Sequence, residues 1–317
     1  MNAIGIDMSK DTFQACFDEG KGKKFDNTED GIKGFVSEIL KLKFRKNDTR
    51  IGVESTGVYH LLLAIRLTDL GWSVYVINPL ESHKMIMQGL RTVKTDRLDA
   101  EKIRLMTLSK HGYLFCDTKE TLILKGLISE RLALVEMRQQ TKQRLGVNKL
   151  KTLALQSSLP SSHQDLLKTL TKNIKELERL MGKYEQSKQE LLRSIPGIGQ
   201  TAAAALVAFV GDVDRFETPE KLVAYIGLDC RVYQSGTSIH GKGYISKRGN
   251  TYLRHILFNS AFIARQYDKD LFSYYHKKLS EGKHYFSVMC AIERKLVHII
   301  YAVWKRGTPY ESRGKVE

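Results

Sequence analysis

Two aspartates three residues apart, Asp96 and Asp99, are the residues of this 317-residue chain best placed to do chemistry. They stand in the stretch KTDRLDA, and the apolar residues that follow it recur at helical spacing. On a helix, this separation puts both carboxylates on one face, with Cβ atoms roughly 5–6 Å apart. Two such carboxylates repel each other unless a cation lies between them. The alternative is a pair of solvated acids in a first helical turn, where the helix dipole favours negative charge.

Two further acids come at the ends of predicted strands. Asp7 closes the apolar run Ala3–Asp7, and Glu54 closes Arg50–Glu54. The elements expected around them are strands at Ala3–Asp7, Thr12–Phe17 and Phe25, a helix opening at Asn27–Asp30, a strand at Arg50–Glu54, a helix at Tyr59–Leu70 and a strand at Ser73–Ile77. This is the order of a ribonuclease H-like α/β domain, in which the first and fourth strands are neighbours. We therefore expect Asp7 and Glu54 to converge.

Four carboxylates at one edge of a sheet predict a metal centre. Oxygen ligands suit hard cations such as Mg²⁺ or Mn²⁺. Two such ions about 3.5–4 Å apart are the recurring arrangement for in-line displacement at phosphorus. Asp7, Glu54, Asp96 and Asp99 are the predicted ligands.

The motifs GIDMSK, VESTG and KTDRLDA, together with YQSGTSIHGKGYISKRGN nearer the C-terminus, resemble those of a known family. It is the DEDD transposases of bacterial insertion sequences, the family numbered one hundred and ten, which also includes the Piv DNA invertases. The resemblance implies that the four acids are the metal-binding tetrad of a RuvC-like domain. It also implies a catalytic serine at the SGT position, which is Ser235 here. From the residues alone, a serine in a glycine-rich loop is usually a turn residue, and Ser238 and Ser246 are rivals.

Between these ends, Leu122–Leu192 is predicted to be helical, with an interruption near Ser157–Ser162. In the second helix, apolar residues from Leu170 to Leu191 follow alternating steps of four and three, which is typical of a coiled-coil seam. A helical hairpin within one chain and a dimerisation arm are both open. A charged helix face is usually solvated, so phosphate contacts are only one alternative for the basic residues Lys142, Arg144, Lys149 and Lys151.

The remaining sequence predicts a helical domain with nucleic-acid contacts. Ile195–Gly199 precedes an Ala-rich helix and resembles a helix-hairpin-helix element, in which Gly197 and Gly199 would present backbone N–H groups to phosphate. A tight turn between packed helices is the alternative. Residues 230–267 contain no acid, and a helix is expected again from Thr251. The predicted nucleic-acid contacts in this window are Arg231, Lys242, Lys247, Arg248 and Arg254. Thr308–Glu317 is polar and expected to be loose.

Positive charge is concentrated after residue 100 of the chain. The net charge is +16, and residues 1–100 contribute 15 Lys/Arg against 14 Asp/Glu, leaving 36 against 21 for residues 101–317. Such an excess indicates a polyanionic partner. The longest apolar run, Thr201–Val210, is shorter than the about 20 residues that a membrane span needs. With no signal-peptide pattern and four scattered cysteines, we expect a cytoplasmic protein without a membrane partner.

We therefore predict an α/β plus α protein. It has a ribonuclease H-like (RuvC-like) catalytic domain at 1–117, a coiled-coil helical arm at 118–192 and a mostly helical C-terminal transposase domain at 193–317. Its predicted function is a metal-dependent transposase or site-specific recombinase in which Ser235 forms a covalent phosphoserine. The resemblance implies donor and target DNA, a non-coding bridge RNA, and a homodimer that pairs into a tetramer. The alternatives are a RuvC-like nuclease in which water attacks and a nucleic-acid-binding protein without catalysis.

Overall fold

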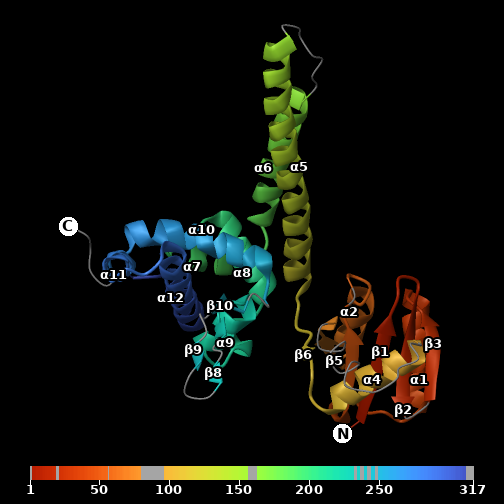
Figure 1. Ribbon diagram of the computed structural model, residues 1–317. Helices are drawn as coiled ribbons and strands as arrows, with labels where there is room; N and C mark the ends of the chain where they lie inside the picture. Colours follow the sequence, from red (N-terminus) through yellow and green to blue (C-terminus); the bar gives the residue numbers. More distant parts are fainter. Residues whose placement is uncertain are drawn as a thin grey trace. The chain divides into compact units, whose positions relative to one another are not determined.

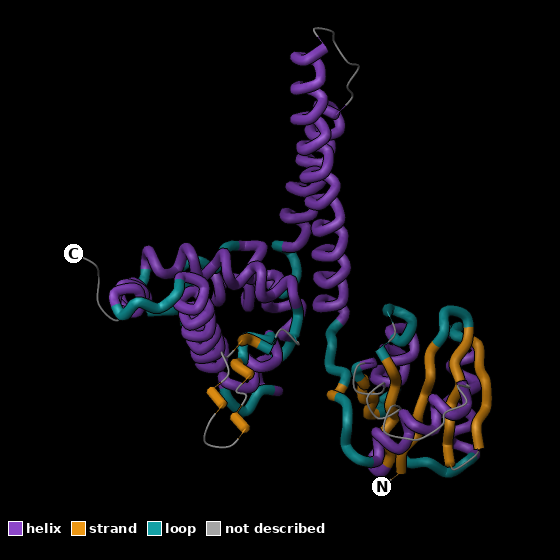
Figure 2. Tube along the Cα trace, viewed as in Figure 1, coloured by secondary structure: helices purple, strands orange, loops and turns teal. Residues whose placement is uncertain are grey.

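The computed structural model describes residues 2–18, 21–55, 57–79, 96–155, 163–231, 234–235, 239–240, 244–246 and 249–311. For some of them, including Asp96 and Ser235, the backbone alone is described. Contacts divide the chain into two compact units, Met1–Cys116 and Asp117–Glu317. The first is a mixed α/β unit and the second is mostly helical (Figures 1 and 2). This agrees with the predicted fold class at that level.

The first unit is built on a six-stranded sheet in the order β3-β2-β1-β4-β5-β6. Its strands are β1 (Asn2–Met8), β2 (Thr12–Asp18), β3 (Lys21–Asp26), β4 (Thr49–Glu54), β5 (Ser73–Ile77) and β6 (Tyr113–Leu114). β1 runs parallel to β4, and β4 runs parallel to β5, while the other neighbours are antiparallel. The predicted strands are confirmed, and so is the adjacency of the first and fourth. The short strand β6 was not predicted, because two exposed residues carry no alternation.

Over the described residues, the helices that accompany this sheet are α1 (Glu29–Lys41), α2 (Leu61–Asp69) and α4 (Asp96–Leu108), with a short 3₁₀ turn η1 (Lys46–Asp48). The predicted start of α1 is confirmed, since the Thr28 side chain accepts a hydrogen bond from the Gly31 N–H at 3.2 Å. The apolar face of α1 is buried at Ile32, Phe35 and Ile39. Phe35 meets Phe13 of β2 edge to face, with ring centroids 5.4 Å apart, so aromatic packing fixes α1 on the sheet.

The second unit begins with a hairpin of two long helices. α5 (Lys119–Leu155) and α6 (His163–Met181) lie side by side along their length (Figure 1). Leu170, Ile174 and Met181 are buried along the predicted apolar seam. Arg131 of α5 bonds Glu178 of α6, with Nη2 and Oε1 2.7 Å apart. The predicted interruption near Ser157–Ser162 lies outside the described residues, which end at Leu155 and resume at His163.

The predicted continuation of the seam to Leu191 is wrong, because the helix stops after Met181. A turn separates α6 from α7 (Gln186–Arg193), and Glu185 there has a φ of 49°, in the left-handed region. The Glu185 N–H donates to Glu120 of α5 at 2.8 Å. The Gln189 side-chain amide donates to the Met181 and Tyr184 carbonyls at 2.8 and 2.7 Å. These bonds satisfy groups that the end of a helix leaves unpaired.

The rest of the second unit packs around a buried helix. The remaining elements are α8 (Gln200–Val210), η2 (Val213–Arg215), α9 (Pro219–Ile226), β7 (Cys230–Arg231), β8 (Gln234–Ser235), β9 (Ile239–His240), β10 (Tyr244–Ile245), α10 (Thr251–Tyr267), α11 (Lys269–Ser280) and α12 (Tyr285–Arg306). Ala202–Ala205 of α8 are all buried, since small side chains let neighbouring helices approach closely. Among the described residues, no helix is long and apolar enough to cross a membrane.

The start of the C-terminal segment is anchored, contrary to the prediction that Thr308–Glu317 is loose. The Tyr310 N–H donates to Ser194 Oγ at 2.8 Å, and its hydroxyl donates to the carboxylate of Asp268. Residues beyond Glu311 lie outside the described residues. The aromatic ring explains the difference, because a tyrosine with two hydrogen bonds and partial burial holds the chain against the domain.

Candidate active site

Asp7 and Glu54 are brought to the same edge of the sheet by strand register. The parallel pairing of β1 and β4 matches Gly5 with Gly52 and Ile6 with Val53, so Asp7 and Glu54 are level one position further on. Adjacent strands lie about 4.8 Å apart, which puts the two acidic residues side by side. Both side chains are half-buried. The predicted convergence of these two acids therefore has its backbone basis in the structure.

Helix α4 crosses the face to which these acids point. It contacts β1, β2 and β4, and two glycines allow the approach. A Cβ added to Gly5 would lie 2.7 Å from the Cα of Arg104 and would overlap the Ala100 carbonyl. A Cβ on Gly52 would lie 3.0 Å from the Cβ of Thr107. Since alternate strand residues share a face, Asp7 and Glu54 project to the same side as Gly5 and Gly52, which is the α4 side.

The predicted pair of aspartates opens α4. Asp96 is its first residue, and Asp99 directly precedes Ala100, whose carbonyl lies against Gly5. The Asp99 side chain is 18% exposed, and its Oδ1 lies 3.1 Å from Lys102 Nζ. The ammonium group of Lys102 thus supplies the positive charge beside this carboxylate. The helix therefore carries Asp99 to the face of the sheet where Asp7 and Glu54 project.

Among the side chains that the structure describes, no three His, Cys, Asp or Glu residues form a group that could hold a metal ion. That set does not include the side chain of Asp96. The donors at this edge are nonetheless all carboxylates, which are the ligands of hard divalent cations. The chemistry of the donor set fits a divalent metal.

Ser235 is the last residue of β8, and β7, β8, β9 and β10 form a β-ribbon between α9 and α10 (Figure 1). The ribbon is built from nested antiparallel pairs. β7 pairs with β10, matching Cys230 with Ile245, and β8 pairs with β9, matching Ser235 with Ile239. The rival Ser238 lies outside the described residues. The outgoing and returning strands are thus paired twice, and Ser235 belongs to the second of these pairs.

The base of the ribbon is closed by polar contacts around Arg254. Its Nη1 donates to the carbonyls of Ile226 and Gly249 at 2.9 and 2.8 Å, and Nη2 donates to Thr251 Oγ1 at 3.0 Å. Ile226 ends α9, and Gly249 precedes the N-cap of α10, so one guanidinium ties the outgoing chain to the returning chain. A Cβ on Gly249 would overlap the Tyr225 and Ile226 carbonyls, which explains a glycine there.

Ser246 is part of the same base. Its buried hydroxyl donates to Asp229 Oδ1, and its N–H donates to the Asp229 carbonyl at 2.8 Å. Ser246 therefore holds the base of the ribbon in place.

The carboxyl of Glu293 on α12 is buried and interacts with Arg254. Burial raises the pKa of Glu293 to about 7, and the charges of Arg254 and Arg294 act in the opposite direction.

The other predicted nucleic-acid contacts fall in different places. The backbone of Arg231 is in β7, while Lys242, Lys247 and Arg248 lie outside the described residues. Gly197 has a φ of 85°, and a Cβ there would lie 2.8 Å from the Ala264 nitrogen, so it serves close packing against α10. Gly199 caps α8, with open space around it. The geometry of Gly197 supports the alternative of a tight interhelical turn, and a phosphate contact by Gly199 stays a prediction.

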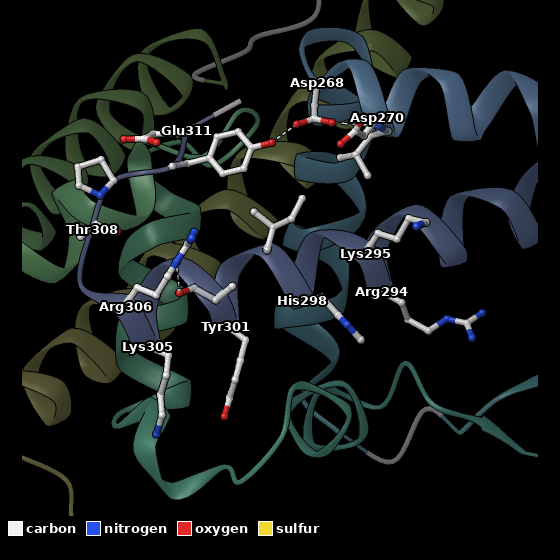
Figure 3. Close-up of a pocket in the computed structure, with 15 residues that line it drawn as sticks. Asp268, Asp270, Arg294, Lys295, His298, Tyr301, Lys305, Arg306, Thr308 and Glu311 are labelled. Atoms are coloured by element: carbon white, nitrogen blue, oxygen red, sulfur yellow. Dashed lines mark hydrogen bonds between the residues drawn. The ribbon is translucent and has the colours of Figure 1, made fainter. Parts of the chain in front are cut away.

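A cavity of about 1120 Å³ lies between α12 and the anchored C-terminal segment (Figure 3). Its basic side chains have partners: Lys305 bonds Asp214, and Lys295 Nζ lies 4.4 Å from the centre of the Tyr274 ring. Arg294 Nε donates to the Cys290 carbonyl at 3.2 Å. None of the predicted catalytic residues lines this cavity. It therefore adds no chemistry to the candidate site.

Comparison with known proteins relates these features to a family. Residues 4–152 match a transposase family profile, that of the IS110-type DEDD transposases, and residues 189–276 match the transposase IS116/IS110/IS902 family. The pilin gene-inverting protein of Moraxella bovis is 30% identical over 325 residues, which cover 98% of each chain. The chain belongs to the IS110/IS116 family of transposases. The first matched segment of this transposase carries all four predicted carboxylates, and the second carries Ser235.

Two other relatives extend over nearly the whole transposase. The transposase of insertion sequence element IS1328 from Yersinia enterocolitica is 26% identical over 349 residues, covering 98% of both chains. That of IS1111A from Coxiella burnetii is 26% identical over 340 residues, covering 97% of this chain and 90% of the relative. Membership of the family identifies the chain as a DNA-processing enzyme.

Four residues that position the site are evident in the structure. Gly5 and Gly52 position α4, and Arg254 and Asp229 hold the ribbon, but none of the four was predicted in that role. An isolated glycine in an apolar strand is a signal for close backbone approach, so Gly5 and Gly52 could have been found. Arg254 carries no such signal, since a basic residue in a basic window indicates phosphate equally well.

Proposed function

We propose that this transposase cuts and rejoins DNA with a divalent metal held by Asp7, Glu54, Asp96 and Asp99, and with Ser235 as nucleophile. The observation that carries the proposal is the level register of Asp7 and Glu54 beneath α4. The order of the strands across the sheet, β3-β2-β1-β4-β5, supports a ribonuclease H-like fold for the first unit. The matched segments support the pairing of a carboxylate unit with a serine unit in one chain.

The metal, the carboxylates and the serine would each have a separate role in the reaction. Mg²⁺ or Mn²⁺, when bound, would supply positive charge at the scissile phosphate. The four carboxylates would hold that metal, and the ribbon would supply the Ser235 hydroxyl. The Ser235 oxygen bonds to phosphorus and gives up its proton, while the bond to the 3′ oxygen breaks and that oxygen takes up a proton. The phosphoserine keeps the energy of the diester, so a 3′-hydroxyl of the exchanged strand can attack it and release the serine.

Exchange between two DNA partners requires two active sites at least. We infer a homodimer, pairing into a tetramer, with α5 and α6 as the dimerisation arm. A non-coding bridge RNA that selects donor and target DNA is part of the proposal, because the sequence resembles transposases that use one. The net charge of +15 over residues 101–317 supports binding of a polyanion.

The test is denaturing electrophoresis of labelled DNA after incubation with protein and Mg²⁺. Wild type should give a protein-linked band, and Ser235→Ala should lose it while keeping its folded spectrum. Ser273→Ala, which changes an exposed serine of α11, should keep the band. Free cleaved ends made equally by wild type and Ser235→Ala would mean that water attacks and that the protein is a nuclease.

The carboxylates are tested in the same assay. Asp7→Asn and Glu54→Gln should each abolish the cut products, because they remove charge that stabilises the transition state. Asp11→Asn is the matched control, an exposed aspartate in the turn between β1 and β2, and it should retain activity. Near-wild-type cleavage by Asp7→Asn and Glu54→Gln would exclude the proposed tetrad. Loss of cleavage in Asp11→Asn would mean that the assay reports general damage.

A further inference from the structure

The hairpin of α5 and α6 divides into a neutral half and a strongly basic half. Residues 119–137 of α5 and residues 176–193, which run from the end of α6 through α7, form the half next to the helical core, and they contain seven Lys/Arg against seven Asp/Glu. Residues 138–155 and 163–175 form the distal half, and they contain eight Lys/Arg against one acid, Asp165. The sequence alone indicated only the basic residues of the first helix, Lys142, Arg144, Lys149 and Lys151. Since α5 and α6 lie side by side (Figures 1 and 2), the distal half combines the basic residues of both helices.

The two halves also differ in how their charges are used. In the neutral half, ion pairs join Arg131 to Glu178, Arg179 to Glu176 and Lys188 to Glu185. In the distal half, over the residues that the structure describes, the only ion pair is Lys168 with Asp165, at 3.0 Å. The basic side chains there are exposed, apart from a half-buried Arg138. The distal half therefore carries a net charge of +7 that the fold itself does not offset.

A groove of about 510 Å³ runs along one side of this half. It is lined by cationic or amide side chains with one valine, namely Gln140, Gln143, Arg144, Val147, Asn148, Lys151 and His163. Arginine and lysine are the usual partners of phosphate, and side-chain amides donate to phosphate and sugar oxygens as well. A second row, Lys168, Lys172 and Lys175, lines another concave surface, along α6.

Solvation alone does not account for this arrangement. Lys168 and Lys172 are four residues apart, and Lys172 and Lys175 are three apart, so like charges face each other on the helix. Each such pair costs roughly 0.2–0.5 kcal/mol in an isolated helix. A helix face that only needs to be soluble can carry mixed signs, as the neutral half of the same hairpin does. The repulsion is relieved when a polyanion lies against the surface.

We propose that the distal half of the α5–α6 hairpin binds the sugar–phosphate backbone of a nucleic acid without reading its sequence. Arg144, Lys151 and His163 make the phosphate contacts in the groove, and Gln140, Gln143 and Asn148 donate to sugar and phosphate oxygens. The proposal rests on the proposed function only in that the enzyme acts on nucleic acid. DNA duplex and folded RNA present the same phosphodiester chemistry, so both are used as probes.

The experiment measures the salt dependence of binding for the full-length protein. Labelled duplex DNA and a labelled RNA hairpin, each of arbitrary sequence, are titrated by fluorescence anisotropy between 50 and 300 mM KCl. For Arg144→Ala with Lys151→Ala, the slope of log affinity against log salt should fall by about 1.8 on duplex, since each phosphate contact contributes about 0.9. That is about a 60-fold loss of affinity at 0.1 M salt, if affinity at 1 M is unchanged.

The matched control removes the same charge from the neutral half. Lys183→Ala with Arg193→Ala changes two exposed basic residues next to the core, and its slope should equal that of wild type. A probe whose slope falls only in the Arg144/Lys151 variant is bound by the distal half, which also decides between DNA and RNA. Equal changes in both double variants, or none in either, would overturn the proposal. So would binding of the distal half to phosphatidylserine vesicles with nucleic-acid slopes unchanged.

Failure here is separable from failure of the proposed function. The slope is measured without Mg²⁺ and without cleavage, so it is independent of Ser235 and the carboxylates. If wild type forms protein-linked DNA and the Arg144/Lys151 variant has an unchanged slope, the proposed recombinase function stands and the distal half is not its binding surface. If the slope of that variant falls and no protein forms the linked band, the distal half binds nucleic acid and the proposed function is rejected.

Discussion

Gly5→Ala should displace α4 and thereby disable the carboxylate edge while the sheet still forms. The added Cβ would lie 2.7 Å from the Cα of Arg104, and nearer still to the Ala100 carbonyl and the Arg104 nitrogen. Carbon atoms in contact are about 3.5–4.0 Å apart, so α4 must move by about 1 Å. The atoms involved are backbone, and no side-chain rotation relieves the overlap. Asp99 moves with the helix because it adjoins Ala100.

Two effects of different size follow from this movement. Overpacking of this kind typically costs about 1–3 kcal/mol of stability. Misplacement of catalytic groups by about 1 Å can lower a rate about 100-fold. We therefore expect a lowered melting temperature, and a cleavage rate about 100-fold lower even at temperatures where the variant is fully folded.

The assay combines thermal unfolding with single-turnover cleavage at 20 °C. Gly34→Ala is the matched control, because Gly34 is exposed within α1 and an added Cβ would meet only Phe25 Cδ1 at 4.0 Å. That change should raise stability by up to about 1 kcal/mol and leave cleavage unchanged. A Gly5→Ala protein with wild-type melting and wild-type cleavage would refute the account of how α4 is positioned.

Two more residues can be tested at the base of the ribbon. Arg254→Ala should lower stability by about 1–3 kcal/mol, because the Ile226 and Gly249 carbonyls lose a donor, and it should leave the salt slope of nucleic-acid binding unchanged. A slope lower by about 0.9 in salt titrations would instead make Arg254 a phosphate ligand. Glu293 has a pKa raised to about 7 by burial. The folded chain thus holds a proton that the unfolded chain releases near its ordinary pKa, and wild-type stability falls as pH rises from about 4.5 to about 7. Glu293→Gln should remove that fall, giving a gain of up to about 3 kcal/mol at pH 8 in denaturant unfolding and none at pH 4; parallel pH curves for both proteins would contradict it.

Sequence alone predicted the elements that follow from local pattern. The short apolar runs Ala3–Asp7 and Arg50–Glu54 predicted β1 and β4, and the strand order expected for them predicted that Asp7 lies beside Glu54. The stretch Asn27–Asp30 predicted the start of α1, because capping side chains such as that of Thr28 are a short-range signal. These features depend on residues within a few positions of one another, or on one common strand order.

What could not be predicted depends on residues that are distant in the sequence. The end of α6 at Met181 depends on Glu120, 65 positions before its bonding partner Glu185. The role of Arg254 depends on the Ile226 carbonyl, 28 positions away. In both cases the local pattern, a heptad seam or a basic window, favoured a different interpretation. Long-range hydrogen bonds leave no periodicity in a sequence, so they have to be seen in the fold.

The charge division of the hairpin has a consequence for assembly. Two copies that approached through their distal halves would bring a charge of +7 against +7, and this repulsion acts over a distance of about 8–10 Å at physiological salt. A nucleic acid held between the two arms removes the barrier and adds attraction for both copies. Enzyme without substrate would then remain in smaller assemblies, and the complete exchange complex would form only where DNA or RNA is already bound. Sedimentation velocity should show this as an increase in assembly size on adding nucleic acid, and assembly that is complete without it would contradict the idea. Such coupling would keep a strand-cutting enzyme inactive until its substrate is in place.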